Sequence, residues 1–352
     1  MRKMIIGCII TLVILGGCAQ GNSQPAQSTQ GEAPTPQQAP TASQTAVKND
    51  GKEEPKFPQK PLEIVIGVST GGTADITARI IAAASDKYFG QPMAVVSKPG
   101  GSQAIGMGDV LNSSPDGYKI GLPMSSALTI VPHTAQTTYS HDGFEPIAGI
   151  ADIPMIFAVK ADSPWKTFDE WVEYVKQHPN EFTLSVAGIN TEPALIMEEM
   201  SAKLGLQVKI VPYEGGGPAA TALLGGHVDG NIQTISGIGK YIESGDFRAL
   251  TFNGNHEDAP PYLKDVPTVD DLGLDLKTRL NMGIIAPKGI PQETLEILQG
   301  TFKQILEDPE VISSLKKADV QVQYVNPGDY KNSILTLYDS NEDILKNIGV
   351  KK

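Results

Sequence analysis

Cysteine is almost absent from this chain, because its 352 residues include only Cys8 and Cys18. Everything after residue 18 therefore lacks the means to form a disulfide or a cysteine-ligated metal site. A fold built from this sequence must be stabilised by burying apolar side chains. The last 290 or so residues are ample for that and suggest two domains.

A long hydrophobic run is also missing. The apolar stretch at 4–15 is shorter than the roughly 20 apolar residues that span a bilayer. Arg2 and Lys3 precede it, in the order typical of a secretory signal peptide. The stretch runs into Leu15-Gly16-Gly17-Cys18, which resembles a bacterial lipobox. We expect residues 1–18 to be a lipoprotein signal peptide and the exported protein to be lipid-anchored at Cys18, facing the extracytoplasmic side. An ordinary signal peptide cut nearby is the alternative.

Basic residues are outnumbered, with 28 Lys and Arg against 40 Asp and Glu and a formal net charge of −12. Proteins that bind nucleic acid present a basic face, so the sequence argues against a nucleic-acid partner. An anionic ligand would have to be held by local dipoles, because the overall charge of the protein repels it.

Large apolar residues are scarce between positions 19 and 60, where the first is Phe57. The segment is rich in Gln, Ser, Thr, Pro and Ala. Such a composition buries too little apolar surface to offset the entropy of ordering. We expect 19–60 to be a flexible tether.

The stretch 62–88 combines three features of an anion-binding site. Leu62 to Ile66 is apolar and β-branched and predicts a buried strand. Residues 67–75 form a loop of small side chains, and apolar residues recur at helical spacing from Ile76. The N-terminus of a helix has unpaired N–H groups and the positive end of the helix dipole. We therefore expect this loop to hold a carboxylate.

Strands and helices alternate along the rest of the chain, which predicts an α/β fold. Small polar loops enter helices again at 123–126 and 187–191, and ligands in α/β sheets bind at the carboxyl ends of strands. We predict two lobes joined by two crossing strands. The first lobe should comprise 61–155 and 283–352, and the second 156–282. An anion bound between loop 69–75 and loop 188–191 would bridge them.

Several motifs occur in an order that resembles one family. They are Gly71-Gly72-Thr73-Ala74-Asp75, Lys98-Pro99-Gly100-Gly101, Pro115-Asp116-Gly117-Tyr118, Phe144-Glu145-Pro146-Ile147, Val211-Pro212-Tyr213-Glu214-Gly215, Leu223-Leu224-Gly225-Gly226-His227-Val228-Asp229, Asp265-Val266-Pro267-Thr268-Val269, Ala286-Pro287-Lys288-Gly289-Ile290-Pro291 and Asp308-Pro309-Glu310-Val311. The chain from Pro61 to Val350 resembles the substrate-binding proteins of tripartite tricarboxylate transporters, often called the Bug family.

The resemblance implies a two-lobed α/β fold like that of type II periplasmic binding proteins. It also implies a non-enzymatic, monomeric protein, without cofactor or metal, that captures a small carboxylate between its lobes and delivers it to a membrane permease. The residues expected to contact the ligand are Ser69, Thr70, Gly71, Gly72, Thr73, Asp75, Ser125, Ser126, Gly188, Asn190, Thr191, Tyr213 and Gln233.

The sequence departs from the family pattern at two places. Gly67 and Thr70 stand where the family usually has prolines, so the first loop should be less rigid. Gln233 stands where the family commonly has an aspartate. A neutral amide does not pair with an ammonium group as a carboxylate does, which favours plain mono-, di- or tricarboxylates over amino acids.

Two other functions are compatible with the sequence. Gly67-Val68-Ser69-Thr70-Gly71 matches the G-x-S-x-G nucleophile elbow and is followed by five histidines, so a secreted hydrolase using Ser69 is one alternative. Only the tether precedes the strand, however, whereas an elbow needs a sheet and an oxyanion loop built upstream. A sensor or adhesin lipoprotein that binds a partner protein is the other alternative. Asp75 also has a structural interpretation, as a first-turn residue paired with Arg79.

Overall fold

A computed structural model of the protein describes residues 57–150, 153–320 and 323–349. These residues belong to one compact unit. The predicted signal peptide, the lipidation site Cys18 and the tether up to residue 56 lie outside the described residues. Within the described part of the chain, no helix is both long enough and apolar enough to cross a membrane.

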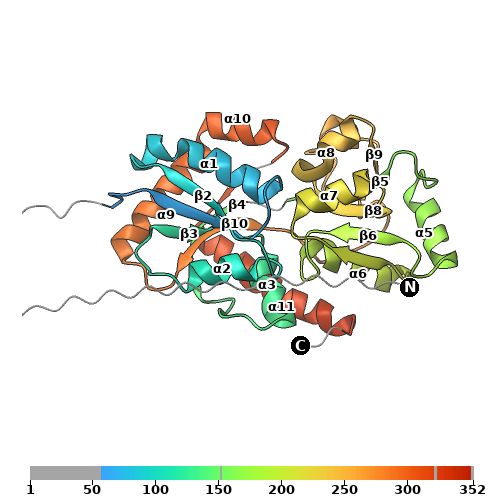
Figure 1. Cartoon of the computed structure of the whole chain (residues 1–352), viewed down its shortest axis with the longest axis horizontal. Helices are drawn as coiled ribbons and strands as arrows, with labels where there is room; N and C mark the ends of the chain where they lie inside the picture. The colour runs from blue at the N-terminus through green and yellow to red at the C-terminus, as the bar shows by residue number, and fades with distance from the viewer. Residues whose placement is uncertain (1–56, 151–152, 321–322, 350–352) are drawn as a thin grey trace, which may run out of the picture. The chain divides into compact units, whose positions relative to one another are not determined.

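The first sheet has six strands in the order β11-β4-β10-β3-β1-β2. They are β1 (Leu62–Ile66), β2 (Met93–Ser97), β3 (Lys119–Gly121), β4 (Phe144–Ile150), β10 (Met282–Pro287) and β11 (Tyr324–Val325). Strand β1 pairs in parallel with β2 and β3, whereas β10 runs antiparallel to β3 and β4. The late strand β10 thus lies in the middle of a sheet formed mostly by the first part of the chain (Figure 1).

The second sheet has five strands in the order β7-β6-β8-β5-β9. They are β5 (Met155–Lys160), β6 (Thr183–Val186), β7 (Lys209–Pro212), β8 (Gly230–Thr234) and β9 (Phe247–Phe252). Strand β6 pairs in parallel with β7 and β8, whereas β5 runs antiparallel to β8 and β9. Both sheets are therefore mixed, and the predicted α/β class is confirmed.

Helices follow most of the strands. They are α1 (Thr73–Phe89), α2 (Ala104–Leu111), α3 (Ser126–Thr129), α4 (Val131–Thr134), α5 (Phe168–Gln177), α6 (Glu192–Leu204), α7 (Gly216–Leu224), α8 (Ile235–Glu243), α9 (Gln292–Glu307), α10 (Pro309–Lys317) and α11 (Pro327–Asn347), with a 3₁₀ turn at Pro261–Leu263.

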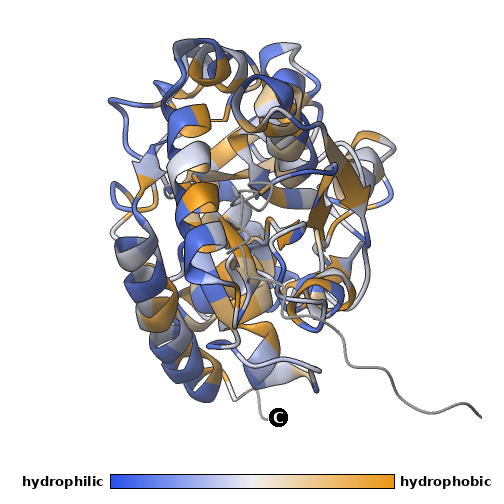
Figure 2. Cartoon of the chain, turned by 90° about the vertical axis from the view of Figure 1, so that its left-hand side faces the viewer, coloured by the Kyte–Doolittle hydropathy of each residue, from blue (hydrophilic) through white to orange (hydrophobic). Residues whose placement is uncertain are grey.

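Alternate side chains of β1 point to opposite faces of its sheet, as the period of a strand requires. Ile64 and Ile66 pack in one cluster with side chains of α1, α9 and α10. Val65 packs in another cluster with side chains of α2 and α11. Helices thus cover both faces of β1, which explains why this strand is an unbroken apolar run. In Figure 2 the strands are coloured mostly hydrophobic, whereas the helices carry both hydrophobic and hydrophilic residues.

Two segments connect the sheets. One joins β4 to β5, and the other joins β9 to β10. They meet where the backbone N–H of Ile153 donates to the carbonyl oxygen of Leu280 at 2.8 Å. Met155 already pairs in the second sheet and Met282 in the first. The lobe boundaries at 155/156 and 282/283 stay a prediction.

Candidate functional site

The loop between β1 and α1 lies against the loop between β7 and α7. Both the backbone N–H and the hydroxyl of Ser69 donate to the carbonyl oxygen of Glu214, the former at 3.3 Å. A Cβ built on Gly217 would lie 3.1 Å from the carbonyl oxygen of Thr70, and one on Gly72 would lie 4.0 Å from the backbone nitrogen of Gly216. The small residues of both loops permit this close approach of two backbones.

Hydroxyl groups from the two halves of the chain meet beside these loops. Thr73, the first residue of α1, is hydrogen-bonded through its Oγ1 to the hydroxyl of Thr234 and, at 2.6 Å, to that of Ser236. Thr234 is the N-cap of α8. Thr73 and Thr234 are both buried, so these contacts are shielded from bulk water.

The N-termini of three helices therefore converge. These are α1 with N-cap Gly72, α7 with N-cap Gly215 and α8 with N-cap Thr234. None of the three N-caps makes a side-chain capping hydrogen bond within the described chain. Helix N-termini carry N–H donors and partial positive charge, so three of them together favour an anion.

The carboxylate of Asp75 contacts the loop before α1 and the next turn of α1 itself. Its Oδ2 accepts a hydrogen bond from the backbone N–H of Gly71 at 3.0 Å, and its Oδ1 lies 2.9 Å from Nη2 of Arg79. This is the structural interpretation that the sequence left open, because the carboxylate fixes the loop and pairs one turn along the helix.

The second predicted loop, at Ser125 and Ser126, meets a carboxylate of the protein itself. The hydroxyl of Ser125 donates to Oε1 of Glu192 at 2.6 Å, although the two residues belong to parts of the chain with different sheets. Ser126 accepts a hydrogen bond from the amide of Gln103 at 3.0 Å. Burial raises the pKa of the Glu192 carboxyl.

The third predicted loop, at Gly188, Asn190 and Thr191, also touches the first half of the chain. The backbone N–H of Asn190 donates to the hydroxyl of Ser102 at 3.3 Å. The hydroxyl of Thr191 donates to the carbonyl oxygen of Gly188 at 2.6 Å, which closes the loop on itself. Gly188 has a φ of +130°, a conformation that favours glycine.

Tyr213 and Gln233 lie on the side of the second sheet. Tyr213 is half-buried and packs against the apolar cluster of that sheet. The amide Nε2 of Gln233 donates to the carbonyl oxygen of Gly216 at 2.7 Å, which attaches the side chain to the start of α7. Gln233 thus orients one of the converging helix N-termini.

The structure adds residues that the sequence analysis missed, namely Ser102, Gln103, Glu192, Glu214, Thr234 and Ser236. Glu192 and Ser102 directly follow predicted motifs, so extending each motif by one residue would have found them. Ser236 had no such signal, because it lies 163 positions from Thr73 and only the fold brings the two hydroxyls together.

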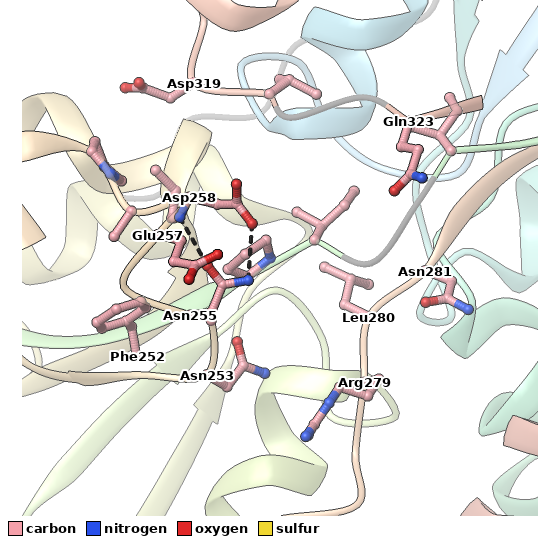
Figure 3. A pocket seen from close by; sticks show the side chains of 18 of the residues that line it. Phe252, Asn253, Asn255, Glu257, Asp258, Arg279, Leu280, Asn281, Asp319 and Gln323 are labelled. Carbon is pink, nitrogen blue, oxygen red and sulfur yellow. Dashed lines mark hydrogen bonds between the residues drawn. The ribbon is translucent and has the colours of Figure 1, made fainter. Parts of the chain in front are cut away.

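The structure also contains a cavity of about 1160 Å³ along the two connecting segments. Figure 3 shows its polar lining, with Asn253 and Asn255 after β9 and Arg279 and Asn281 before β10. None of the thirteen predicted ligand residues lines it. The cavity does reach the start of α8, because Ile235, the first residue of that helix, lines it.

The hydrolase alternative finds no support in the geometry of Ser69. Its hydroxyl donates to a backbone carbonyl, and within the described residues no histidine is hydrogen-bonded to it. His133 and His141 instead pack against Tyr338, and His256 pairs with Asp271. A nucleophilic serine needs a base within hydrogen-bond reach.

Comparison of the sequence with known proteins identifies the family of this chain. The sequence pattern of the family described as "Tripartite tricarboxylate transporter family receptor" matches residues 77–350. A Cupriavidus necator relative, described as "UPF0065 protein in gbd 5'region", is 31% identical over 298 residues, which are 84% of this chain and 90% of the relative.

Solved structures show the same fold. The periplasmic binding protein BugD is 27% identical with a TM-score of 0.79, over 84% of this chain and 100% of BugD. MatC from Rhodopseudomonas palustris, solved with bound malate, is 24% identical with a TM-score of 0.76, over 82% of this chain and 100% of MatC. The predicted likeness to periplasmic binding proteins is confirmed. The chain belongs to the tripartite tricarboxylate transporter receptor family, whose members are solute-binding proteins.

Proposed function

We propose that this protein is a non-enzymatic, lipid-anchored binding protein that holds a small organic carboxylate between its lobes and presents it to a membrane permease. It acts outside the cytoplasm as a monomer. Its ligand contacts come from the loops at 69–75, 188–191 and 213–217, together with the hydroxyls of Thr73 and Ser236.

The observation that carries this proposal is the convergence of the N-termini of α1, α7 and α8. A carboxylate there would meet backbone N–H groups and hydroxyls in place of a lysine or arginine clamp. Such donors make charge-assisted hydrogen bonds, which are about twice as strong as neutral ones. Malate, the ligand of MatC, is a small carboxylate of this class.

A bound ligand would close the two lobes, because its contacts come from both parts of the chain. Thr73 belongs to the part of the chain with the first sheet, and Thr234 and Ser236 to the part with the second. A ligand that contacts both parts binds the closed arrangement more tightly than an open one, and this difference in affinity drives closure. A permease could then recognise the closed form.

The proposed location rests on the first eighteen residues. A short apolar stretch that ends in Leu15-Gly16-Gly17-Cys18 is the expected pattern of a lipoprotein signal. A segment of Gln, Ser, Thr, Pro and Ala then separates the anchor from the folded part. The length of this segment allows the binding domain to reach a membrane partner, while the lipid keeps the protein at the membrane.

The test is a thermal-shift screen of the purified protein against small carboxylates, followed by calorimetry with the best ligand. A ligand at 100 times its dissociation constant should stabilise the protein by about 2.7 kcal/mol. Gly72→Val should weaken binding at least tenfold, because its side chain fills the approach to Gly216. Gly300→Val is the control, since Gly300 lies in α9 and nothing lies within 4 Å of a Cβ built there.

The ligand should also be recovered chemically unchanged after prolonged incubation with the protein. Conversion of the ligand would contradict the non-enzymatic part of the proposal. Unaltered affinity of Gly72→Val would show that the anion binds elsewhere, with the cavity beside Asn281 as the next place to test.

A further inference from the structure

The turn that enters α2 has an unusual backbone. Its four consecutive residues have φ values of +123°, +58°, +51° and +79°, at Gly100, Gly101, Ser102 and Gln103. Glycine adopts such values freely, whereas a residue with a side chain does so at a cost in free energy. Such local strain persists only where the surrounding structure stabilises it. The contacts of Ser102 and Gln103 therefore show what fixes this turn.

Gln103 attaches the turn to two of the predicted ligand loops. It is the N-cap of α2, and only 3% of its surface is exposed. Its side-chain amide donates to the hydroxyl of Ser126 and accepts from the backbone N–H of Met124, both at 3.0 Å. A Cβ built on Gly67 would lie 2.5 Å from Cβ of Gln103, so the turn also packs against the start of the loop between β1 and α1. Gln103 thus anchors the turn to the part of the chain with the first sheet.

Ser102, the preceding residue, contacts the third predicted loop, in the part of the chain with the second sheet. Its hydroxyl oxygen accepts a hydrogen bond from the backbone N–H of Asn190 at 3.3 Å. A Cβ built on Gly188 would lie 2.8 Å from Oγ of Ser102, so the serine side chain packs directly on the backbone of that loop. Two adjacent residues therefore connect all three predicted ligand loops.

We propose that Ser102 is a positioning residue of the ligand site, whose hydroxyl keeps the third predicted loop in place against the other two when the lobes close. Gln103 keeps Ser102 itself in place. This inference rests on the proposed function and assigns Ser102 no contact with the ligand. Because Ser102 and Asn190 belong to different parts of the chain, their hydrogen bond forms only in the closed arrangement. A contact that stabilises only the closed arrangement raises the ligand affinity by slowing opening and release.

Two variants separate this role from a purely structural one. Ser102→Ala and Ser102→Gly both remove the hydroxyl, but only glycine relieves the strain of the positive φ. The probe is whichever of acetate, malate, butanedioate and hexanedioate the wild type binds most tightly. Calorimetry gives the affinity, stopped-flow kinetics give the two rates, and thermal unfolding without the probe gives the stability.

Both variants should bind the probe about fivefold more weakly, which is the effect of one net hydrogen bond. The loss should appear in the dissociation rate, with the association rate unchanged. Without the probe, Ser102→Gly should melt at a higher temperature than Ser102→Ala. The affinity should therefore follow the hydroxyl and not the stability.

Ser113→Ala is the matched control. Ser113 is a half-buried serine just after α2, and its hydroxyl donates to the carbonyl oxygen of Val110 at 2.7 Å, within the same part of the chain. This variant should keep the affinity and both rates of the wild type.

Wild-type affinity in both Ser102 variants overturns the inference, while the proposed function stands. A loss of affinity confined to the less stable of the two variants also overturns it, because the serine would then act through stability alone. Failure of the wild type to bind any carboxylate of the thermal-shift screen overturns the proposed function and this inference with it.

Discussion

Gly67 offers a sharp test of how the anion-binding loop is held. Its φ is not in the left-handed region, so alanine meets no backbone strain there. A Cβ at this position would, however, lie 2.5 Å from Cβ and 2.8 Å from Cα of Gln103. Real carbon atoms do not approach so closely, so Gly67→Ala must push the two segments apart.

Gln103 is poorly placed to yield. It adopts a φ of +79°, which is uncommon for a residue with a side chain. Both polar atoms of its side-chain amide are also hydrogen-bonded, the nitrogen to the hydroxyl of Ser126 and the oxygen to the backbone N–H of Met124. Overpacking against a fixed neighbour costs about 1–3 kcal/mol. For a protein of this size the melting temperature should fall by about 2–10 °C.

The assay is reversible urea unfolding of the wild type and Gly67→Ala, with carboxylate binding measured on the folded variant. Binding should weaken as well, because the displaced loop carries the N–H donors of α1. Gly300→Ala is the control, since nothing lies within 4 Å of its added methyl and alanine is favoured in a helix by about 0.5–1 kcal/mol. A Gly67→Ala protein as stable as the wild type would refute the close approach between the two segments.

Two further predictions concern other parts of the protein. Asp308, the N-cap of α10, accepts hydrogen bonds from Lys87 at 2.7 Å, from Tyr88, and from the backbone N–H of Glu310 at 2.7 Å, which hold its pKa well below the usual range. Its contribution to stability is then complete above the unfolded pKa of about 3.9 and lost as the pH falls below it. Asp308→Asn should therefore be less stable at pH 7 and lose less stability on acidification, as measured by urea unfolding between pH 7 and pH 3; parallel curves would contradict this. Cys18→Ser should move the protein from the membrane fraction to the soluble fraction and abolish labelling by a radioactive fatty acid, whereas an unchanged distribution would argue against the lipid anchor.

Much of the first half of the fold could be predicted from local patterns. The apolar run at Leu62–Ile66 and the helical spacing after it were sufficient for β1 and α1. The region after Asp229 was harder to predict from the sequence. The strand β8, the helix α8 and the strand β9 were not anticipated. Strand β8 reads Gly-Asn-Ile-Gln-Thr, with little β-propensity, and it is a strand because β5 and β6 flank it. Tertiary pairing overrode the local preference.

The ligand contacts of the candidate residues stay a prediction, and the structure shows only which partners these residues have within the protein. Ser125 was predicted as a hydrogen-bond donor for a ligand, and in the structure its hydroxyl donates to Glu192. Asp75 was a candidate contact, and the structure pairs it with Arg79. In both cases the competing partner belongs to the protein, and its distance depends on how elements pack.

The sequence by itself determined the class of the protein: the family motifs, the small-residue loops before helices, and an apolar strand at the first loop. These are local properties, because glycine, hydroxyl residues and helix-start signals act through their own backbone. Only the tertiary structure decided which helix N-termini face each other and which carboxylate is buried between the two parts. Thr73 meets Ser236 across 163 positions of chain, and Ser125 meets Glu192 across 67. Such contacts arise where helix starts from the two parts of the chain meet, and no local pattern encodes the distance between them.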